Sequence, residues 1–420
     1  MAKVHIVGAG LAGLACAVSL ASRGIKVILY EGAGQAGGRC RSFHDEIMGC
    51  TIDNGNHLLL SGNLAVNEFL ALIGAESELV GPDRAIFPFI DLTDQSEWTV
   101  EIARNWWPTW LYNRSRRIPG IRLRDCLKAL KLLNLKEDCA LQEVLDNDSK
   151  LYKRFFEPLA VGVLNTPART CSAALLATVV KETFGRGGGA CKPRMAKRGL
   201  SETFIHPALS YLSDRKCNFH THHSLRALSI DNDRVNALQF YNTKEVVAAN
   251  DRVVLAIPAH VMGNLLPTIK TPNSFHPIVN AHFRLNFQIF SPQGAGLLGV
   301  VGGTAQWVFF RDDILSVTVS AADDLSRESN TVIANRIWCD LRKALTNLPE
   351  ELPMQHRIIK ERRATFSQTP ASIRYRSTCK TGFDNLFVAG DWTDTGLPAT
   401  IEGAIRSGFQ AAGVICSSNR

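Results

Sequence analysis

Near its N-terminus the sequence places a group of glycines between a β-prone run and a helix-prone run. The β-prone run is short and apolar, the helix-prone run carries apolar residues at helical spacing, and a second β-prone run ends at an acidic residue. The parts are, in chain order, residues 4–7, Gly8, Gly10, Gly13, residues 14–20, residues 26–30 and Glu31. A strand, a tight turn, a helix and a second strand in this order predict the βαβ unit of a dinucleotide-binding fold.

Each glycine of this turn has a physical task that a larger side chain would prevent. Gly8 permits the tight turn, Gly10 allows the backbone to approach a pyrophosphate, and Gly13 allows the helix to pack closely on the strand. The N-terminus of the helix offers phosphate its free N–H groups and the positive end of its dipole. Glu31 follows the second β-prone run and is placed to accept hydrogen bonds from the hydroxyls of an adenosine ribose.

A second copy of the glycine pattern, residues 294–299, lacks this context. It leads directly into residues 300–310, which read as a strand and leave too little room for a crossover helix of about ten or more residues. We therefore interpret it as part of a hairpin. Without a second dinucleotide pattern, the sequence offers no obvious site for a nicotinamide cofactor.

Composition excludes several classes of protein and site. The eleven cysteines include no C-x-x-C pair and no Cys/His cluster at ligand spacing, so neither a metal site nor a disulfide framework is indicated, and a reducing compartment fits. No uninterrupted apolar run approaches the roughly twenty residues that span a bilayer. The net charge of +8 is compatible with contact to an anionic membrane. We expect a cytoplasmic protein at the inner face of the cell membrane, with no nucleic-acid partner.

A glycine-rich loop with two arginines follows the second β-prone run. Gly32, Gly37 and Gly38 permit close approach to a ligand. Arg39 and Arg41 can neutralise phosphate through charge-assisted hydrogen bonds. The loop therefore extends the predicted phosphate site beyond the first turn.

These residues resemble motifs of a known family. The run E-x-x-x-x-x-G-G-R-x-x-S at residues 31–42 is similar to the second FAD motif of the amine oxidase and phytoene desaturase superfamily, and residues 53–57 resemble the next motif in chain order. The resemblance implies an FAD cofactor, with the segment around His57 passing over the isoalloxazine ring. It also implies that the backbone near Leu225 holds the adenine.

The C-terminus resembles the partner motif of the same superfamily. Residues 385–391 read as a strand ending at Gly390 and Asp391, and a helix of small and apolar residues begins at Pro398 and Thr400. In the superfamily such a helix end points at N1 and the C2 carbonyl of the flavin, where its dipole stabilises the negative charge of the reduced ring. The resemblance implies that Asp391 bonds the ribityl and phosphate region; taken alone, this residue reads as a carboxylate that caps a turn.

Together these motifs predict the residues that hold the cofactor. They are Gly8, Gly10, Leu11, Ala12, Gly13, Glu31, Gly32, Gly37, Gly38, Arg39, Asn54, Gly55, Asn56, His57, Leu225, Gly390, Asp391, Pro398, Ala399 and Thr400. Amine oxidases of the superfamily that tether their flavin use a cysteine just before the C-terminal motif. Cys379 lies outside that sequence context, so we expect FAD to be bound without a covalent link.

The fold class that follows is α/β, with a Rossmann-type FAD-binding domain built from discontinuous segments and an α+β substrate domain. We assign residues 1–80, 200–258 and 380–420 to the first domain and residues 81–199 and 259–379 to the second. The substrate domain reads as helical at residues 123–145 and 151–163, and as strand-rich at residues 281–290 and 306–320.

Part of the substrate domain resembles one subfamily. Residues 155–167, 171–174 and 305–309 are similar to the squalene-associated FAD-dependent desaturases, the hydroxysqualene dehydroxylases of hopanoid and isoprenoid biosynthesis. The resemblance implies that hydroxysqualene, a polyisoprenoid alcohol, loses its hydroxyl as water and that the allylic cation accepts hydride from reduced FAD, giving squalene. An external electron donor would then reduce FAD again. For Asn165 and the two residues after it, a helix-ending turn is the alternative interpretation.

Such a reaction requires a deep apolar channel and a proton donor. Glu157 and His57 are the residues we nominate as donor. A carotenoid-type desaturase, which moves hydride from substrate to FAD, is the main alternative function. An amine oxidase is less favoured, because the substrate domain resembles a different subfamily. A prenyl-binding protein without flavin chemistry is also less favoured, because the phosphate loop is intact.

Residues 104–124 combine interfacial aromatic and basic side chains. Three of the seven tryptophans, Trp106, Trp107 and Trp110, and six arginines fall there with no acidic residue. This pairing suits a lipid headgroup region, and a squalene-type substrate resides in the bilayer. We expect peripheral membrane contact through this segment; the alternative is that its tryptophans fill the core of the substrate domain.

Overall fold

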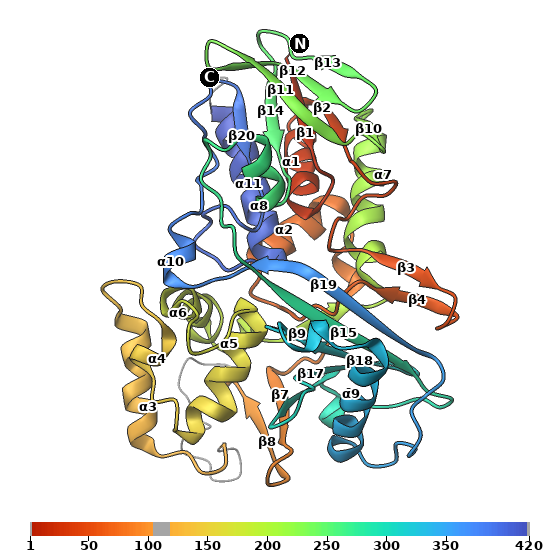
Figure 1. Cartoon of the computed structure of the whole chain (residues 1–420), viewed down its shortest axis with the longest axis vertical. Helices are drawn as coiled ribbons and strands as arrows, with labels where there is room; N and C mark the ends of the chain where they lie inside the picture. The colour runs from red at the N-terminus through yellow and green to blue at the C-terminus, as the bar shows by residue number, and fades with distance from the viewer. Residues whose placement is uncertain (1, 104–117, 418–420) are drawn as a thin grey trace.

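The computed structural model describes residues 2–103 and 118–417, which form an elongated molecule of two halves (Figure 1). The first strand and the last helix lie in the same half, so the chain begins and ends together there. Most of the segment predicted to contact a membrane, residues 104–124, lies outside the described residues, which resume at Ile118.

A five-stranded sheet organises the half that holds the first strand. The strand order is β10-β2-β1-β14-β20, and every neighbouring pair is parallel. The strands are β1 (Lys3–Val7), β2 (Lys26–Tyr30), β10 (Asn218–His220), β14 (Arg252–Leu255) and β20 (Leu386–Val388). Strands from distant parts of the chain share one sheet, which confirms the Rossmann-type α/β fold built from discontinuous segments. The domain boundaries themselves stay a prediction.

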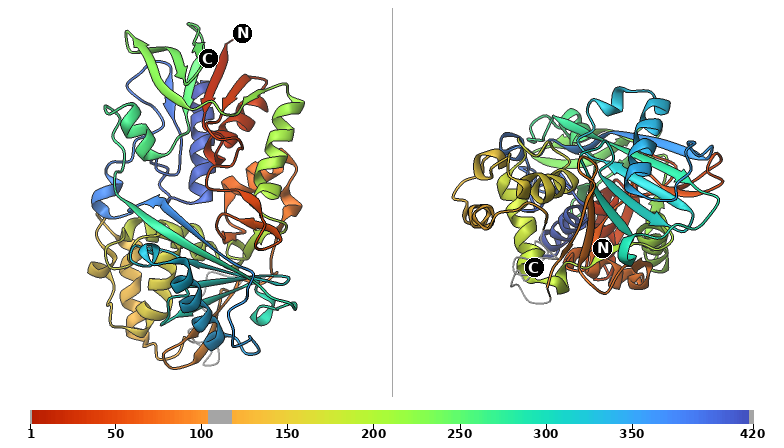
Figure 2. Two further views of the ribbon diagram at one scale, coloured as in Figure 1. Left: turned by 45° about the vertical axis from the view of Figure 1, so that its right-hand side comes forward. Right: turned by 90° about the horizontal axis from the view of Figure 1, so that it is seen from below.

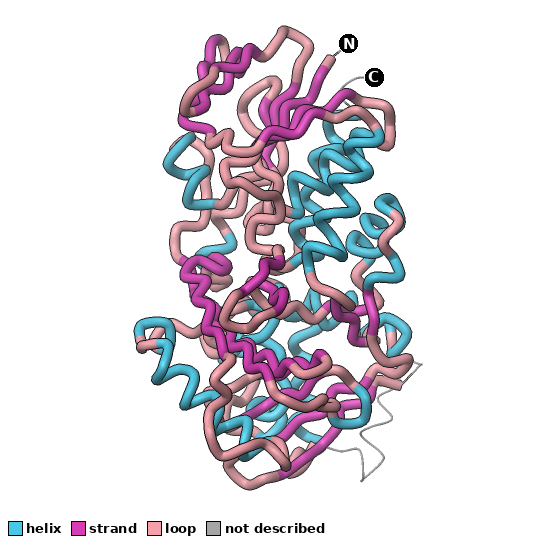
Figure 3. The backbone as a smooth tube through the Cα atoms, turned by 90° about the vertical axis from the view of Figure 1, so that its right-hand side faces the viewer, coloured by secondary structure: helices cyan, strands magenta, loops and turns pink. Residues whose placement is uncertain are grey.

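Both faces of this parallel sheet are buried, because its strands are apolar at successive positions. Ile6 and Leu29 face a layer of helices, whereas Val7 and Ile28 face a small antiparallel sheet. The helices gather on one side of the parallel sheet (Figure 3). They are α1 (Leu11–Ala21), α2 (Leu64–Ile73), α7 (His206–Asp214) and α11 (Ile401–Ser417); the opposite side carries β11 (Leu225–Asp231), β12 (Arg234–Phe240), β13 (Lys244–Val246) and α8 (Ala259–Leu265).

Helices α1 and α11 pack closely because small residues line their contact. A Cβ at Gly408 of α11 would lie 2.2 Å from the carbonyl oxygen of Ala12. Real Cβ contacts do not come this close, so only glycine fits at this crossing. Leu11 and Thr400, at the beginnings of the two helices, line the same cavity. The packing therefore brings two helix N-termini to one site.

The second half is built on a seven-stranded sheet of order β19-β15-β18-β17-β16-β7-β8. Its strands are β7 (Ile86–Asp91), β8 (Ser96–Glu101), β15 (Phe275–Arg284), β16 (Leu297–Val301), β17 (Trp307–Arg311), β18 (Ile314–Val319) and β19 (His356–Phe366). The long strands β15 and β19 run from this sheet toward the first half (Figure 2). Helix α9 (Asn330–Ala344) packs its apolar stripe on one face of the sheet, through Ile333, Ile337 and Leu341. The helices beside the sheet are α3 (Leu123–Ala129), α4 (Leu141–Val144), α5 (Glu157–Leu164) and α6 (Ala173–Glu182).

The predicted helical run at residues 123–145 is interrupted. Helix α3 ends at Ala129, a 3₁₀ turn covers Leu130–Asn134, and α4 forms only after residues 135–140. Within this gap Asp138 accepts hydrogen bonds from the Ser172 hydroxyl (2.8 Å) and the Ala174 N–H (2.9 Å) at the start of α6. A carboxylate that satisfies the N–H groups of a neighbouring helix stabilises this break. The run at 151–163 is helical as predicted, with a π-turn at Tyr152–Phe156 before α5.

Two predicted strands have different limits in the structure. Residues 300–310 are not one strand, because a turn at Gly302, with φ of +80°, separates β16 from β17. The interpretation of 294–299 as part of a hairpin is confirmed, since β16 and β17 pair antiparallel. Strand β15 begins at Phe275, before the predicted residue 281, because the sheet accommodates Pro277 at a bulge between His276 and Ile278.

The remaining strands and one helix are short, and the strands form two small sheets of order β3-β4 and β5-β9-β6. They are β3 (Ser42–Asp45), β4 (Cys50–Asp53), β5 (Leu59–Leu60), β6 (Leu79–Val80), β9 (Pro193–Ala196) and α10 (Pro370–Ile373). Among residues 2–103 and 118–417, no helix has the length and apolar character that crossing a membrane requires. The same residues contain no cluster of three or more His, Cys, Asp or Glu side chains suited to a metal ion.

Candidate active site

One cavity of about 760 Å³ extends from the glycine turn after β1 to the aromatic side chains of the seven-stranded sheet. Nearly all of the predicted cofactor residues line it, although they come from both ends of the sequence. They are Gly8, Gly10, Leu11, Ala12, Glu31, Gly32, Gly37, Gly38, Arg39, Asn54, Gly55, Asn56, His57, Leu225, Gly390, Asp391, Pro398, Ala399 and Thr400. Gly13 is the exception, and its place is in the packing between α1 and β1.

The glycines of the first turn occupy positions where a side chain would collide with protein or fill the cavity. Gly8 has φ of +103°, and a Cβ there would lie 2.3 Å from the carbonyl oxygen of Ala256. A Cβ at Gly13 would lie 1.9 Å from the carbonyl oxygen of Gly8. At Gly10, by contrast, no protein atom lies within 4 Å of the Cβ position. Only at Gly10 does the open side of the backbone face the space a pyrophosphate would take.

Glu31 is held in place by the backbone around the turn. Its Oε2 accepts the N–H of Ala9 at 2.8 Å, and its Oε1 accepts the N–H of Ala33 at 2.9 Å. Each carboxylate oxygen has a further lone pair. The carboxylate lines the cavity at the end of β2 and is fixed in an orientation that suits the ribose hydroxyls of a dinucleotide.

Arg39 and Asp391 form an ion pair between the two predicted motifs. The Nη2 of Arg39 donates to Oδ1 of Asp391 at 2.7 Å, and its Nη1 donates to the carbonyl oxygen of Ala364. Burial alone would lower the pKa of Arg39, but the charge and hydrogen bond of Asp391 raise it. Among the described residues the Asp391 carboxylate accepts no N–H of its own turn. The turn-capping alternative is therefore not what the structure shows for this side chain.

Arg41 provides a second test of whether the cavity suits an anionic cofactor. Its Nε is buried and has no hydrogen-bond partner among the described residues. Arg41 lines the cavity, and its Cβ lies 3.1 Å from the Cβ position of Gly37, which pairs with Gly10 just before α1. A buried donor without a partner is costly, and a phosphate oxygen would satisfy it. The donor set at this end of the cavity fits a pyrophosphate.

The loop at residues 54–57 is anchored by a directional chain of hydrogen bonds. Asn56 Nδ2 donates to the Thr318 hydroxyl at 3.2 Å, and that hydroxyl donates to Asn280 Oδ1 at 2.8 Å. Asn280 Nδ2 in turn donates to the carbonyl oxygen of Asn54 at 3.3 Å. Side chains of β15 and β18 in the seven-stranded sheet therefore position the loop that the sequence predicts to pass over a flavin.

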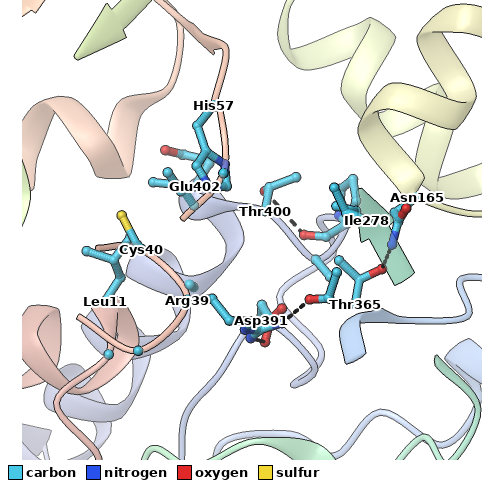
Figure 4. A pocket seen from close by; sticks show the side chains of 18 of the residues that line it. Leu11, Arg39, Cys40, His57, Asn165, Ile278, Thr365, Asp391, Thr400 and Glu402 are labelled. Carbon is cyan, nitrogen blue, oxygen red and sulfur yellow. Dashed lines mark hydrogen bonds and ion pairs between the residues drawn. The ribbon is translucent and has the colours of Figure 1, made fainter. Parts of the chain in front are cut away.

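His57 faces the same cavity, beside Glu402 and opposite Arg39 (Figure 4). Burial lowers the pKa of His57 to about 4; the carboxylate of Asp53 opposes this shift and Arg39 adds to it. The imidazole is therefore neutral at pH 7. The neutral ring can donate or accept a hydrogen bond there, but it is not an imidazolium that could act directly as an acid.

Glu157, the second nominated proton donor, does not line the cavity. Helix α5 turns Leu159, Gly162 and Val163 toward the cavity. Glu157 is electrostatically coupled to Arg169 and Lys153, and burial raises the pKa of its carboxyl. This placement favours His57 over Glu157 as the group nearer to a bound substrate.

The lower part of the cavity is apolar and rich in aromatic side chains. Phe89 and Trp307 meet edge to face with their ring centroids 5.4 Å apart. Gly162 gives the indole its place, since a Cβ there would lie 2.7 Å from Trp307 Nε1. The other apolar residues of this region are Leu58, Leu60, Phe87, Val100, Phe155, Leu159, Val163, Val179, Phe184 and Phe309. Such walls suit a long hydrocarbon and exclude water.

Two buried residues that the sequence did not indicate hold the C-terminal motif. Gln368 accepts the N–H of Ala399 at 2.9 Å and donates to the carbonyl oxygen of Leu164 at 2.6 Å, so it links α5 to the start of α11. Arg376 donates to backbone carbonyls of residues 391–393. Neither residue lies in a recognisable pattern, because both act through contacts between distant segments.

Neither Cys379 nor Cys40, the two cysteines near the predicted flavin motifs, is both placed and activated to bind a flavin covalently. Cys379 is not among the residues that line the cavity, and it packs against the core formed by α1 and α11. Cys40 does line the cavity, but burial raises the pKa of its thiol well above the usual range. A protonated thiol is a weak nucleophile. These placements agree with a cofactor bound without a covalent link.

Comparison with known proteins adds independent evidence. The family model described as flavin-containing amine oxidoreductase matches residues 11–416. A hydroxysqualene dehydroxylase of Sinorhizobium fredii is 43% identical over 99% of this chain and 98% of its own length, and one of Zymomonas mobilis is 39% identical over 99% and 100%. A zeta-carotene desaturase of Solanum lycopersicum is 22% identical over 99% of this chain and 81% of its own length.

Solved structures agree on the fold. Putrescine oxidase superposes with a TM-score of 0.74 at 17% identity, covering 99% of both chains. Cyclohexylamine oxidase from Brevibacterium oxydans gives a TM-score of 0.70 at 16% identity, covering 100% of this chain and 99% of the other. With the family match over almost the whole sequence and the dinucleotide cradle open to an apolar chamber, the chain belongs to the flavin-containing amine oxidoreductase family and, within it, to the hydroxysqualene dehydroxylases.

Proposed function

We propose that this protein is an FAD-dependent hydroxysqualene dehydroxylase, which converts hydroxysqualene to squalene and water in the biosynthesis of hopanoids and related isoprenoids. The observation that carries the proposal is the single cavity that joins a dinucleotide cradle to an aromatic, apolar chamber. The hydroxysqualene dehydroxylases that align over the full chain support the same substrate. The cofactor is FAD, and an external electron donor must reduce it before each turnover.

The reaction balances as alcohol plus hydride plus proton giving hydrocarbon plus water. The hydroxyl of hydroxysqualene is on an allylic carbon, so its departure as water leaves a delocalised cation. The chemistry that FAD would supply in its reduced form, held by the glycine turn and Glu31, is the hydride that quenches this cation. The protein must orient the alcohol, exclude water that would recapture the cation, and provide a route for the proton.

The residues of this chain divide these tasks between the two ends of the cavity. The N-termini of α1 and α11 both reach the cavity, where their positive dipole ends would stabilise the negative charge of a bound FAD. Phe89, Trp307 and Phe155 form walls that keep water from the reacting carbon. His57 is the nominated proton donor that faces the cavity, and its neutral ring suits passing a proton on rather than storing one.

An anaerobic single-turnover assay tests the proposal. Enzyme with FAD reduced by dithionite in D₂O is mixed with hydroxysqualene, and the products are analysed by mass spectrometry. We expect squalene that carries one deuterium, since the transferred hydride comes from the exchangeable flavin position. Oxidised enzyme should produce no squalene. If reduced enzyme yields none, and oxidised enzyme instead desaturates a polyisoprenoid, the carotenoid-type desaturase is the correct assignment.

We further propose that the enzyme contacts an anionic membrane through the surface of α3 and the turn after it. Leu127 and Leu130 are 68% and 55% exposed there, and Lys128 and Lys131 flank them in exposed positions. Exposed leucines between basic residues match a headgroup region. The tryptophan-rich segment predicted from the sequence directly precedes this surface in the chain.

Flotation with liposomes measures this contact. At low salt we expect wild type to rise with anionic vesicles, and a Leu127→Ser, Leu130→Ser variant to partition at least about tenfold less, because burying each leucine is worth roughly 1.5–3 kcal/mol. Salt should weaken binding of both proteins. Val246→Ser, an exposed position in the other half, is the control. Equal flotation of wild type and the leucine variant would exclude this surface.

A further inference from the structure

Two groups of polar side chains at the cavity differ in whether they leave a hydroxyl proton unpaired. In the first group the hydroxyl of Thr318 accepts from Asn56 and donates to Asn280, so its one proton is used within the protein. The second group consists of Asn165 and Thr365. Both line the cavity and lie close together at its wall (Figure 4).

Asn165 is fixed in a single orientation by three contacts. Its Oδ1 accepts the N–H of Ala321 at 2.7 Å, which identifies the oxygen of the amide because a backbone N–H can only donate. Its Nδ2 donates to the carbonyl oxygen of His276 and to the Thr365 hydroxyl, both at 3.0 Å. The residue is 3% exposed and ends α5 with φ of +44°. The residue thus ends the helix, as the alternative interpretation holds, and also sets the direction of the hydroxyl next to it.

The Thr365 hydroxyl accepts from Asn165, so its own proton must point elsewhere. Among the described residues it donates to no acceptor. Thr365 is 8% exposed and its side chain faces the cavity. The preceding residue, Ala364, accepts a hydrogen bond from Arg39 of the predicted cofactor loop. Thr365 therefore offers a donor at the junction between the cofactor end and the apolar end of the cavity.

We propose that the Thr365 hydroxyl binds the oxygen of the substrate alcohol and that Asn165 is its positioning residue. The inference rests on the proposed function and adds how the enzyme selects and places its substrate. A long hydrocarbon can slide along apolar walls, whereas one hydrogen bond fixes the carbinol carbon at a single point. The same contact distinguishes substrate from product, because squalene has no oxygen to accept the proton.

Binding of substrate and product to the oxidised holoenzyme tests this inference. Hydroxysqualene and squalene are titrated in detergent while the flavin absorbance is followed. Thr365→Val keeps the shape and removes the hydroxyl, so we expect about tenfold weaker binding of hydroxysqualene and unchanged binding of squalene. Thr365→Ser should restore alcohol binding. Asn165→Asp, which cannot donate to the hydroxyl, should also lose alcohol binding selectively.

The control is Thr178→Val, in which the lost hydroxyl bonds only the carbonyl oxygen of Ala174 within α6. Its affinities for both ligands should equal those of wild type. The inference is overturned if Thr365→Val binds hydroxysqualene as wild type does, or if it loses both ligands equally. Wild-type enzyme that forms no squalene in the single-turnover assay would instead overturn the proposed function, and this inference with it.

Discussion

Replacing Gly10 with valine is expected to abolish the retention of FAD while leaving the protein folded. The position is open on the protein side, because no atom lies within 4 Å of the Cβ site, and its φ of −74° and ψ of 178° are accessible to valine. The added side chain would occupy the space where the pyrophosphate meets the backbone and the N-terminus of α1. We therefore expect the variant to fold normally and to lose FAD binding.

The measurement has two parts, flavin content after purification and thermal unfolding of the apoprotein. We expect at least about a hundredfold weaker FAD binding, a loss of roughly 3 kcal/mol, with an apoprotein melting temperature close to that of wild type. Gly382→Val is the matched control, since Gly382 also has an open Cβ site but does not line the cavity. A Gly10→Val protein that keeps full flavin occupancy would contradict the assignment of this turn.

The cofactor half could be predicted from sequence because its chemistry demands local patterns. A turn that approaches phosphate needs glycine at fixed spacings, and the ribose acceptor must follow the second strand. The roles of Gly8, Gly10 and Glu31 can therefore be predicted from a short segment of sequence. The structure brings these residues to the same cavity as Asp391, as the motifs predict.

The substrate half offered fewer such signals, because its contacts join segments that are distant in sequence. Gln368 and Thr365 sit at the end of β19 without any motif, and their roles depend on α5 and α11. Strand β10 is only Asn218–His220, too short to show a periodicity. The helical run at 123–145 breaks because Asp138 caps α6, a partner that local helical propensity does not reveal. Glu157 shows the same limit. The sequence predicts that it lies on a helix, but which residues of α5 line the cavity depends on how the helix packs.

Asp391→Asn is expected to weaken FAD binding by about tenfold or more, with little change in the stability of the apoprotein. The carboxylate is buried and bonds Arg39 at 2.7 Å, so it orients a guanidinium between the two cofactor motifs. A hydrogen bond to a charged group is worth about 1.5–3 kcal/mol, and the amide oxygen of asparagine would keep only the weaker, less charge-assisted part of it. Removing a negative charge near an anionic cofactor acts in the opposite direction, and we expect the loss of orientation to be the larger effect.

Fluorescence titration of apoprotein with FAD measures the effect, and a double-mutant cycle with Arg39→Gln assigns it to the pair. If the two residues act together, the double variant should bind FAD about as weakly as either single variant, so the effects will not add. Asp394→Asn is the control, because it removes the same charge from an exposed position of the same loop. Unchanged or tighter binding by Asp391→Asn would show that charge repulsion outweighs orientation, and Asp391 would then have no role in holding the cofactor.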